Sequence, residues 1–422
     1  MTLSKMGKPR VFIMFRVVLS LLLVTIGLTT GLTAGHAQRS QTLWTIGLSP
    51  TFEDTMNTIL ADYQATYGTA VQWRDFSGDA LYFALQNAVA SGNVPDVVNL
   101  NVPLLLEFVE RRDVQVLADD ALEGYFPNMT DAFRVAGEPY GVPWYIAPPL
   151  LMINRALFLE AGLDPDAPLA TRADLFAAAR HIKDETGIDG FMPNVGAQQM
   201  LYRFAEAGLP ILSEDGFTAV FDSPAHVELL ATYVDLFQAG YFSEDALLRG
   251  YVGALERYQN GQLAMLISGP QLLTRIRDAS PDIYAQTSLA PYPASDDSSA
   301  IHAPLMGLAI PKGAPHAAAV QLARFIAGAN AQLTLARATP VYPTTLTAAE
   351  DPFFNAVSAD LETQARRLQV SQLALARDLT LDVPNPQDLY EVFMENIEAA
   401  FYGHKTPAQA LEDAALFWNS RL

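Results

Sequence analysis

The sequence contains no cysteine among its 422 residues, and positively charged residues are scarce. The absence of cysteine excludes disulfides, a thiol nucleophile, thiolate metal ligands and the N-terminal cysteine that carries a lipid anchor. Lysine and arginine number 26 against 46 aspartates and glutamates, which gives a formal net charge of −20. A chain this acidic disfavours nucleic acids and anionic membrane surfaces as partners. We therefore expect no nucleic-acid partner.

Motifs for catalysis and metal binding are missing as well. The six histidines are scattered without metal-ligand spacing, and no Gly-x-Ser-x-Gly elbow, Walker loop or dinucleotide fingerprint occurs. The sequence accordingly predicts no catalytic residue, no metal site and no cofactor, and so no enzymatic activity. Because carboxylates are plentiful, a secreted glycosidase that uses a pair of them stays open as an alternative.

The N-terminus has the three parts of a secretory signal. Four basic residues precede the apolar run Val17–Leu28, and Gly35-His36-Ala37 supplies small residues at the positions that signal peptidase reads. We predict a signal peptide over residues 1–37 that is cut after Ala37, and the alternative is an uncleaved membrane anchor. The expected product is an exported, periplasmic monomer without a lipid anchor.

Strand and helix patterns alternate from residue 41 onward. Apolar spacing predicts strands at Gln41–Leu48, Ala70–Phe76 and Asp96–Leu100, with helices at Thr51–Tyr67 and Ala80–Ala90 between them. Strands and helices that alternate with short links predict a parallel sheet. Ligands of such sheets lie beyond the carboxyl ends of the strands, so the residues that follow these strands are expected at one rim.

The stretch Gly141–Gly162 is the expected junction between two parts of the chain. The run Pro149–Ile153 predicts a buried strand, and Asn154 is a plausible cap for the helix that follows. Before that strand, Trp144 and Tyr145 could present flat apolar faces and polar edges to a ligand. Ordinary core packing is the alternative for both rings.

Beyond Ala170 the pattern is mostly helical, with short strands predicted at Leu263–Ile267, Ser288–Pro293 and Gly307–Ile310. Ser268-Gly269-Pro270 ends the first of these strands and starts a helix. Such a turn can direct backbone N–H groups at a ligand oxygen, although an ordinary strand–helix turn is equally compatible with the sequence.

Taken in order, these segments resemble the extracellular solute-binding proteins of ABC importers, in the maltose-binding-protein-like branch that binds sugars and oligosaccharides. The segments that carry the resemblance are TFEDTMNTILADYQATYG, SGNVPDVVNLN, YGVPW, MINRALFLEAGLDPDAP, FDSP, NGQLAMLISGP, GLAIPKGAPH, TPVYP and GHKTPAQALEDA. They cover almost the whole chain after the signal. Each is weak alone, and their shared order and spacing make the resemblance specific.

The resemblance implies the α/β, two-lobed periplasmic-binding-protein fold of type II, with a hinge of three crossings and a ligand cleft between the lobes. The crossings are expected near Pro143–Pro148, Leu289–Pro293 and Gly328–Leu333. Lobe one would hold residues 38–146 and 294–329, and lobe two residues 147–293 and 330–422. The implied function is the substrate-binding component of an ABC importer, which captures a sugar or small oligosaccharide and delivers it to the transmembrane permease subunits.

The resemblance also implies a set of ligand-binding residues. They are Ser77, Gly78, Asn101, Trp144, Tyr145, Gly269, Gln271, Met306, Gly307, Tyr342 and Tyr390. Turn formation is the alternative for Asn101, and core packing is the alternative for Tyr390. Gln271 departs from the family, which often has tryptophan at this position, and this puts the size and type of sugar in doubt.

A different ligand is also compatible with the resemblance, namely a glycerol-phosphate-type polyol ester. A cleft for such a ligand would need a lysine or arginine near a helix N-terminus. The rim segments offer only Arg74, which argues against this alternative.

Overall fold

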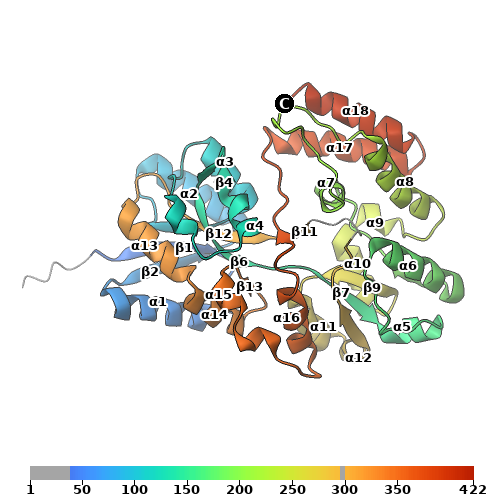
Figure 1. Ribbon diagram of the computed structural model, residues 1–422, viewed down its shortest axis with the longest axis horizontal. Helices are drawn as coiled ribbons and strands as arrows, with labels where there is room; N and C mark the ends of the chain where they lie inside the picture. The colour runs from blue at the N-terminus through green and yellow to red at the C-terminus, as the bar shows by residue number, and fades with distance from the viewer. Residues whose placement is uncertain (1–38, 295–299) are drawn as a thin grey trace, which may run out of the picture. The chain divides into compact units, whose positions relative to one another are not determined.

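The computed structural model describes residues 39–294 and 300–422 (Figure 1). The predicted signal peptide and its cleavage after Ala37 lie outside the described residues. Among the residues that are described, no helix combines the length and the apolar character that crossing a bilayer requires.

The first of two main sheets has six strands in the order β13-β6-β12-β3-β1-β2. Its strands are β1 Gln41–Ile46, β2 Val71–Phe76, β3 Val97–Asn101, β6 Gly141–Ile146, β12 Leu305–Ala309 and β13 Tyr342–Pro343. Strand β1 pairs in parallel with both β2 and β3, which confirms the parallel sheet predicted from the alternating pattern. Strand β12 runs antiparallel between β3 and β6.

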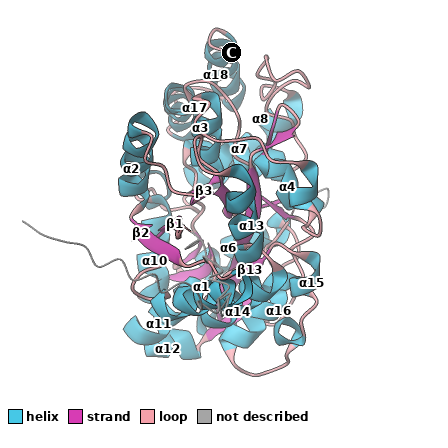
Figure 2. Cartoon of the chain, turned by 90° about the vertical axis from the view of Figure 1, so that its left-hand side faces the viewer, coloured by secondary structure: helices cyan, strands magenta, loops and turns pink. Residues whose placement is uncertain are grey.

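Helices cover both faces of the first sheet. They are α1 Glu53–Tyr67, α2 Gly78–Ser91, α3 Val102–Glu110, α13 His316–Ile326 and α14 Ala329–Ala338. Successive strand residues point to opposite faces: Val97 joins a core with α1, α13 and α14, whereas Val98 joins a second core with α2 and α3. Figure 2 shows α1 and α14 side by side under the sheet.

The second main sheet has the strand order β10-β7-β9-β8. Its strands are β7 Leu150–Asn154, β8 Asp189–Phe191, β9 Leu263–Ser268 and β10 Thr287–Ala290. The helices associated with its core are α5 Arg155–Glu160, α6 Arg172–Thr186, α7 Ala197–Glu206, α8 Pro224–Gln238, α10 Gly250–Gln259, α11 Gln271–Ala279, α17 Pro386–Phe401 and α18 Pro407–Asn419. All of β7 is buried, and the Asn154 side chain accepts from the Ala156 and Leu157 amides, as the sequence predicted.

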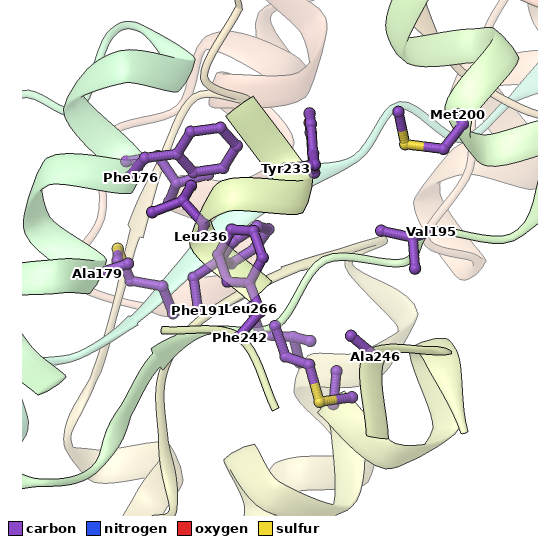
Figure 3. Close-up of a cluster of buried hydrophobic side chains, with 14 of the residues drawn as sticks. Phe176, Ala179, Phe191, Val195, Met200, Tyr233, Leu236, Phe242, Ala246 and Leu266 are labelled. Carbon is purple, nitrogen blue, oxygen red and sulfur yellow. The ribbon is translucent and has the colours of Figure 1, made fainter. Parts of the chain in front are cut away.

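Aromatic rings fill the centre of this second core. The ring of Phe242 lies 5.6 Å from Phe176 and 6.2 Å from Phe191, in edge-to-face arrangements. Figure 3 shows these rings with Tyr233 and Leu266 around them. Edge-to-face pairs are a favourable geometry for aromatic rings. These rings belong to the cluster of buried residues that forms the core of the second sheet.

Shorter elements connect the two sheets and cover their edges. The helices are α4 Pro127–Thr130, α9 Asp245–Leu248, α12 Pro281–Ala285, α15 Leu346–Ala349 and α16 Leu361–Val370, and the 3₁₀ turns are Asp119–Leu122, Asp131–Phe133 and Pro352–Asn355. The strands are β4 Arg134–Val135, β5 Glu138–Pro139, β11 Ile301–His302 and β14 Ala376–Arg377.

The segment from Gly328 to Leu333, where the third crossing was expected, is followed by residues that pack against the first sheet. The expected boundary gives residues 330–422 to lobe two, yet Leu335 of α14 is buried in the core of the first sheet. Strand β13 then pairs with β6 at the edge of that sheet, a position that tolerates Pro343. We propose that the third crossing follows β13 and that α14 and β13 belong to lobe one.

Two glutamines, Gln369 of α16 and Gln372 in the turn that follows it, bind the chain segments that cross between the sheets. The Gln369 side chain donates to the carbonyl of Pro148, and the Gln372 side chain donates to that of Pro149 (3.3 Å). Gln372 also accepts from the Tyr292 amide (2.8 Å). Gln372 thus joins the first crossing, between β6 and β7, to the second crossing, between β10 and β12, and Gln369 adds a bond to the first.

Replacing Gln372 tests this connection. Gln372→Ala leaves the buried Tyr292 amide without its acceptor, so we expect a loss of about 1–3 kcal/mol in the free energy of unfolding. Urea titration followed by circular dichroism measures it. Gln364→Ala, on the preceding helix α16 and with a bond only to the nearby Ala359 carbonyl, is the matched control. Equal losses in the two variants would contradict a special role for Gln372.

Candidate functional site

A pocket of about 290 Å³ opens beside the crossings. Its walls come from the segment after β8, the end of β9, the first residues of α6 and α11, and crossing residues such as Ala147 and Tyr292. The parallel strands β8 and β9 both end here. This is the position that ligands of α/β sheets usually occupy.

The turn after β9 brings two of the expected residues, Gly269 and Gln271, to the pocket. A Cβ atom on Gly269 would lie 2.2 Å from Oε1 of Gln271, so the amide of Gln271 lies directly over the glycine. A larger residue at position 269 would displace this amide. Gln271 is exposed, and its amide can both donate and accept hydrogen bonds at the pocket rim.

Tyrosines form much of the remaining wall. Tyr233, Tyr251 and Tyr292 all line the pocket. The Tyr251 hydroxyl is hydrogen-bonded to Ser268 Oγ at the end of β9 (2.7 Å), which orients its ring, and the residue keeps 37% of its surface exposed. A fixed and partly open ring of this kind can stack on a ligand.

A buried carboxylate lies behind the pocket wall. Glu206, at the end of α7, is 1% exposed. Its Oε2 accepts from Arg203 (2.7 Å), from Arg172 (3.3 Å) and from the Tyr292 hydroxyl (2.9 Å). Its Oε1 accepts from the His302 amide (3.0 Å). Glu206 thereby joins two pocket arginines to both ends of the second crossing.

His302 is held as a neutral ring at the same place. It stacks on Tyr202 with ring centroids 3.8 Å apart, and its Nδ1 accepts from the Leu379 amide (3.2 Å). That bond assigns the ring proton to Nε2. Burial, and secondarily the Arg203 guanidinium, lower the pKa of His302 to about 3. The ring is therefore uncharged at physiological pH.

Several expected residues of the first lobe gather at one edge of the first sheet. Met306 lies opposite Asn101 on one side and Tyr145 on the other, and Tyr342 pairs with Ile146. Ser77 and Gly78, at the start of α2, are exposed. None of these residues lines the pocket described above. They form a second group, at the carboxyl ends of the parallel strands.

The side-chain oxygen of Asn101 has a structural role. Its Oδ1 accepts from the Leu104 amide (3.0 Å) and so caps α3. The structure gives its side-chain nitrogen no partner among the described residues, so the amide can still donate to a ligand.

Trp144 packs in the core, so its ring faces are not open to a sugar. It is 0% exposed and lies in the core with Leu308 and the helices α1 and α13. Its neighbour Tyr145 meets it edge-on at 5.0 Å and is only half-buried. Burial and the nearby Asp75 carboxylate raise the pKa of Tyr145, which therefore stays a neutral donor. The core alternative holds for Trp144, whereas Tyr145 keeps a place at the rim.

Gly307, Tyr342 and Tyr390 have structural surroundings as well. A Cβ atom on Gly307 would lie 2.2 Å from the Phe133 ring, so this glycine is needed for core packing. Tyr342 is 3% exposed at the sheet edge. Tyr390 is half-buried and packs 6.1 Å from the Trp418 ring. None of the three lines the pocket.

Among the pocket residues that sequence reasoning missed are Arg172, Arg203, Tyr233, Tyr251 and Tyr292. Four of them lie on amphipathic helices, where nothing marks a pocket residue. Tyr292 had a usable signal because it lies between two prolines inside a predicted crossing.

The chain belongs to the family of bacterial extracellular solute-binding proteins, whose model matches residues 49–333. A solved structure described as a putative oligosaccharide periplasmic-binding protein from Synechococcus sp. MITs9220 is 28% identical, with a TM-score of 0.81, and the match covers 90% of this chain and 98% of that one. These findings confirm the two-lobed fold that the resemblance implied.

Two curated relatives are similar in sequence. The sn-glycerol-3-phosphate-binding periplasmic protein UgpB of Escherichia coli (strain K12) is 27% identical over 357 residues, which cover 74% of this chain and 78% of the relative. The arabinooligosaccharide-binding protein of Halalkalibacterium halodurans is 24% identical over 230 residues, 52% of this chain and 51% of the relative.

The buried His302 predicts an acid-labile contribution to stability. Its pKa of about 3 in the folded protein lies below the value near 6.5 of an unfolded chain, so protons bind more tightly to the unfolded state. The contribution is fully present above about pH 6.5 and is lost as pH falls toward 3. Between pH 7 and 4.5 we expect the native protein to lose about 1–3 kcal/mol more than His302→Asn, which retains an acceptor for Leu379.

Urea unfolding at the two pH values measures this difference. His404→Asn, at an exposed position, is the control and should lose as much stability as the native protein. If His302→Asn also loses as much, His302 is not the buried acid-sensitive group.

Proposed function

We propose that this protein is the substrate-binding component of an ABC importer, which captures a sugar or small oligosaccharide between its lobes and delivers it to the permease. Membership of the solute-binding family supports the class. The oligosaccharide description of the solved Synechococcus structure supports the type of ligand. The observation that carries most weight is a pocket lined by tyrosines and amides beside the crossings.

The chemistry of the pocket suits a saccharide. Tyr251 supplies an apolar face for a sugar ring, while Asn194, Gln199 and Gln271 both donate to and accept from hydroxyls. The volume of about 290 Å³ is at the lower end of small-molecule sites, which span roughly 300–1,000 Å³. It suits one sugar ring, with further units extending toward the first sheet.

Capture requires contacts from both lobes. The pocket provides those of the second sheet, and the exposed Ser77, the Asn101 amide and Tyr145 at the rim of the first sheet can provide the others. A ligand shifts the equilibrium between the open and the closed arrangement of the lobes only if it binds these two states with different affinities. The rim residues therefore complete the site when the lobes close.

We further propose that the protein acts without catalysis and without a cofactor, as a periplasmic monomer released from its signal peptide. The relatives are binding proteins, which supports the absence of catalysis. Product formation from an oligosaccharide, abolished by substitution of one Asp or Glu, would instead support a glycosidase.

A thermal-shift screen tests the function directly. A ligand present at 100 times its Kd adds roughly 2.7 kcal/mol to the free energy of unfolding, which gives a clear rise in Tm. The panel contains neutral and acidic saccharides, polyol phosphates and peptides. Stabilisation by a peptide alone would contradict saccharide binding.

Tyr251→Ala tests the site with any saccharide that the screen returns. Loss of a stacking ring should weaken binding by about 1 kcal/mol, or roughly fivefold, in calorimetry. Tyr402→Ala is the matched control, because Tyr402 is 43% exposed and does not line the pocket. Unchanged affinity in Tyr251→Ala would remove this ring from the site.

A further inference from the structure

The pocket holds an excess of positive charge. Arg172 and Arg203 line it, and no aspartate or glutamate among the described residues does so. His302, the other titratable base in the wall, is neutral at physiological pH. The whole chain has the opposite balance, with 46 acidic residues against 26 lysines and arginines. The pocket thus reverses the charge balance of the chain as a whole.

Glu206 behind the wall balances only half of this charge. Both arginines donate to the same Oε2 atom, which also accepts the Tyr292 hydroxyl. Counted over the residues that the structure describes, one carboxylate shared by two guanidinium groups leaves a formal charge of +1 at this wall. Covering an unbalanced charge of this kind is costly unless an opposite charge joins it.

The two guanidinium groups are placed to receive a second anion. They are neighbours, because both reach one oxygen of Glu206, and their side chains are only 9% and 16% exposed. Each uses one terminal nitrogen for Glu206, and within residues 39–294 and 300–422 the other nitrogens have no hydrogen-bond partner. Arg203 also lies over the Tyr292 ring at 5.6 Å, which helps to fix the plane of its fork.

We propose that Arg172 and Arg203 form an anion subsite and that the natural ligand is an acidic saccharide, with a carboxylate or a phosphate on the sugar. This inference rests on the proposed function. Arginine forks match the geometry of carboxylate and phosphate oxygens, and each such charge-assisted bond is stronger than a neutral one. Glu206 acts as a positioning residue, since it holds both forks at the wall, while the tyrosines and amides bind the ring.

Matched pairs of sugars test the proposal on the native protein. Calorimetry compares D-galacturonate with D-galactose, D-glucuronate with D-glucose, α-1,4-digalacturonate with α-1,4-linked digalactose, and glucose 6-phosphate with glucose. We expect the acidic member of at least one pair to bind about tenfold more tightly or better. The uronate and phosphate arms distinguish the two sources of the anion. Raising NaCl from 50 to 500 mM should reduce this preference.

Variants then locate the effect. Arg203→Gln should remove most of the preference for the acidic member and change the affinity for its neutral partner by less than about threefold. Arg203→Lys keeps the charge but loses the fork, and it should retain part of the preference. Arg180→Gln is the matched control, because Arg180 is exposed on α6 and does not line the pocket. Circular dichroism verifies that each variant is folded.

The outcomes separate this inference from the function on which it rests. If neutral saccharides bind as tightly as their acidic partners, or if folded Arg203→Gln keeps the full preference, the anion subsite is wrong and the sugar-binding function stands. If glycerol 3-phosphate binds and no sugar does, the subsite stands and the saccharide function is wrong. If no member of the panel binds, both are wrong.

Discussion

The hydrogen bonds from Gln369 and Gln372 to the crossing segments are the constraint on which the rest of the structure depends. The two sheets have separate apolar cores, so packing within each core does not set their mutual arrangement. The crossings do, and polar bonds from the end of α16 and the turn after it hold two of them to each other. Because Pro149 and Tyr292 also line the pocket, any change at the crossings alters the pocket walls. The ligand site and the hinge therefore share residues.

Glu206 extends the same principle into the second lobe. Buried hydrogen bonds to a charged group are directional, so they specify an arrangement more narrowly than apolar contact does. The carboxylate binds Tyr292 at one end of the second crossing and the His302 amide at the other. It also holds the arginines that face the pocket. In the proposed subsite, a ligand bound to those arginines is linked to the second crossing through the Glu206 side chain alone. Such a short connection would couple ligand binding to the arrangement of the lobes.

Local pattern was enough to predict the parallel strands and the buried strand before Asn154, and the order of the segments, through their resemblance to a family, was enough to predict the two-lobed fold. Local pattern was not enough where the surroundings of a residue depend on a segment that is distant in the sequence. Helix α14 has an ordinary amphipathic pattern, and nothing in it tells which of two cores will bury Leu335. Neighbouring strand residues point to opposite faces of a sheet. The sequence does not tell which of the two rings, Trp144 or Tyr145, faces the core and which lies at the rim. Arg172 and His302 lie 34 and 96 residues from Glu206, and only the fold brings these groups together.

Charge placement explains how an acidic protein can accept an acidic ligand. At physiological ionic strength the Debye length is about 8 Å, so most of the net charge of −20 is screened from a small molecule at the pocket. The electrostatic interaction of a bound molecule is then set mainly by the groups within contact distance. Among the described residues, these are two arginines and the single carboxylate of Glu206. The acidic surface then costs little in affinity, while it still discourages nucleic acids and anionic lipids, whose many charges extend over the whole molecule. Selectivity among saccharides follows from the few side chains inside the pocket rather than from the field of the protein as a whole.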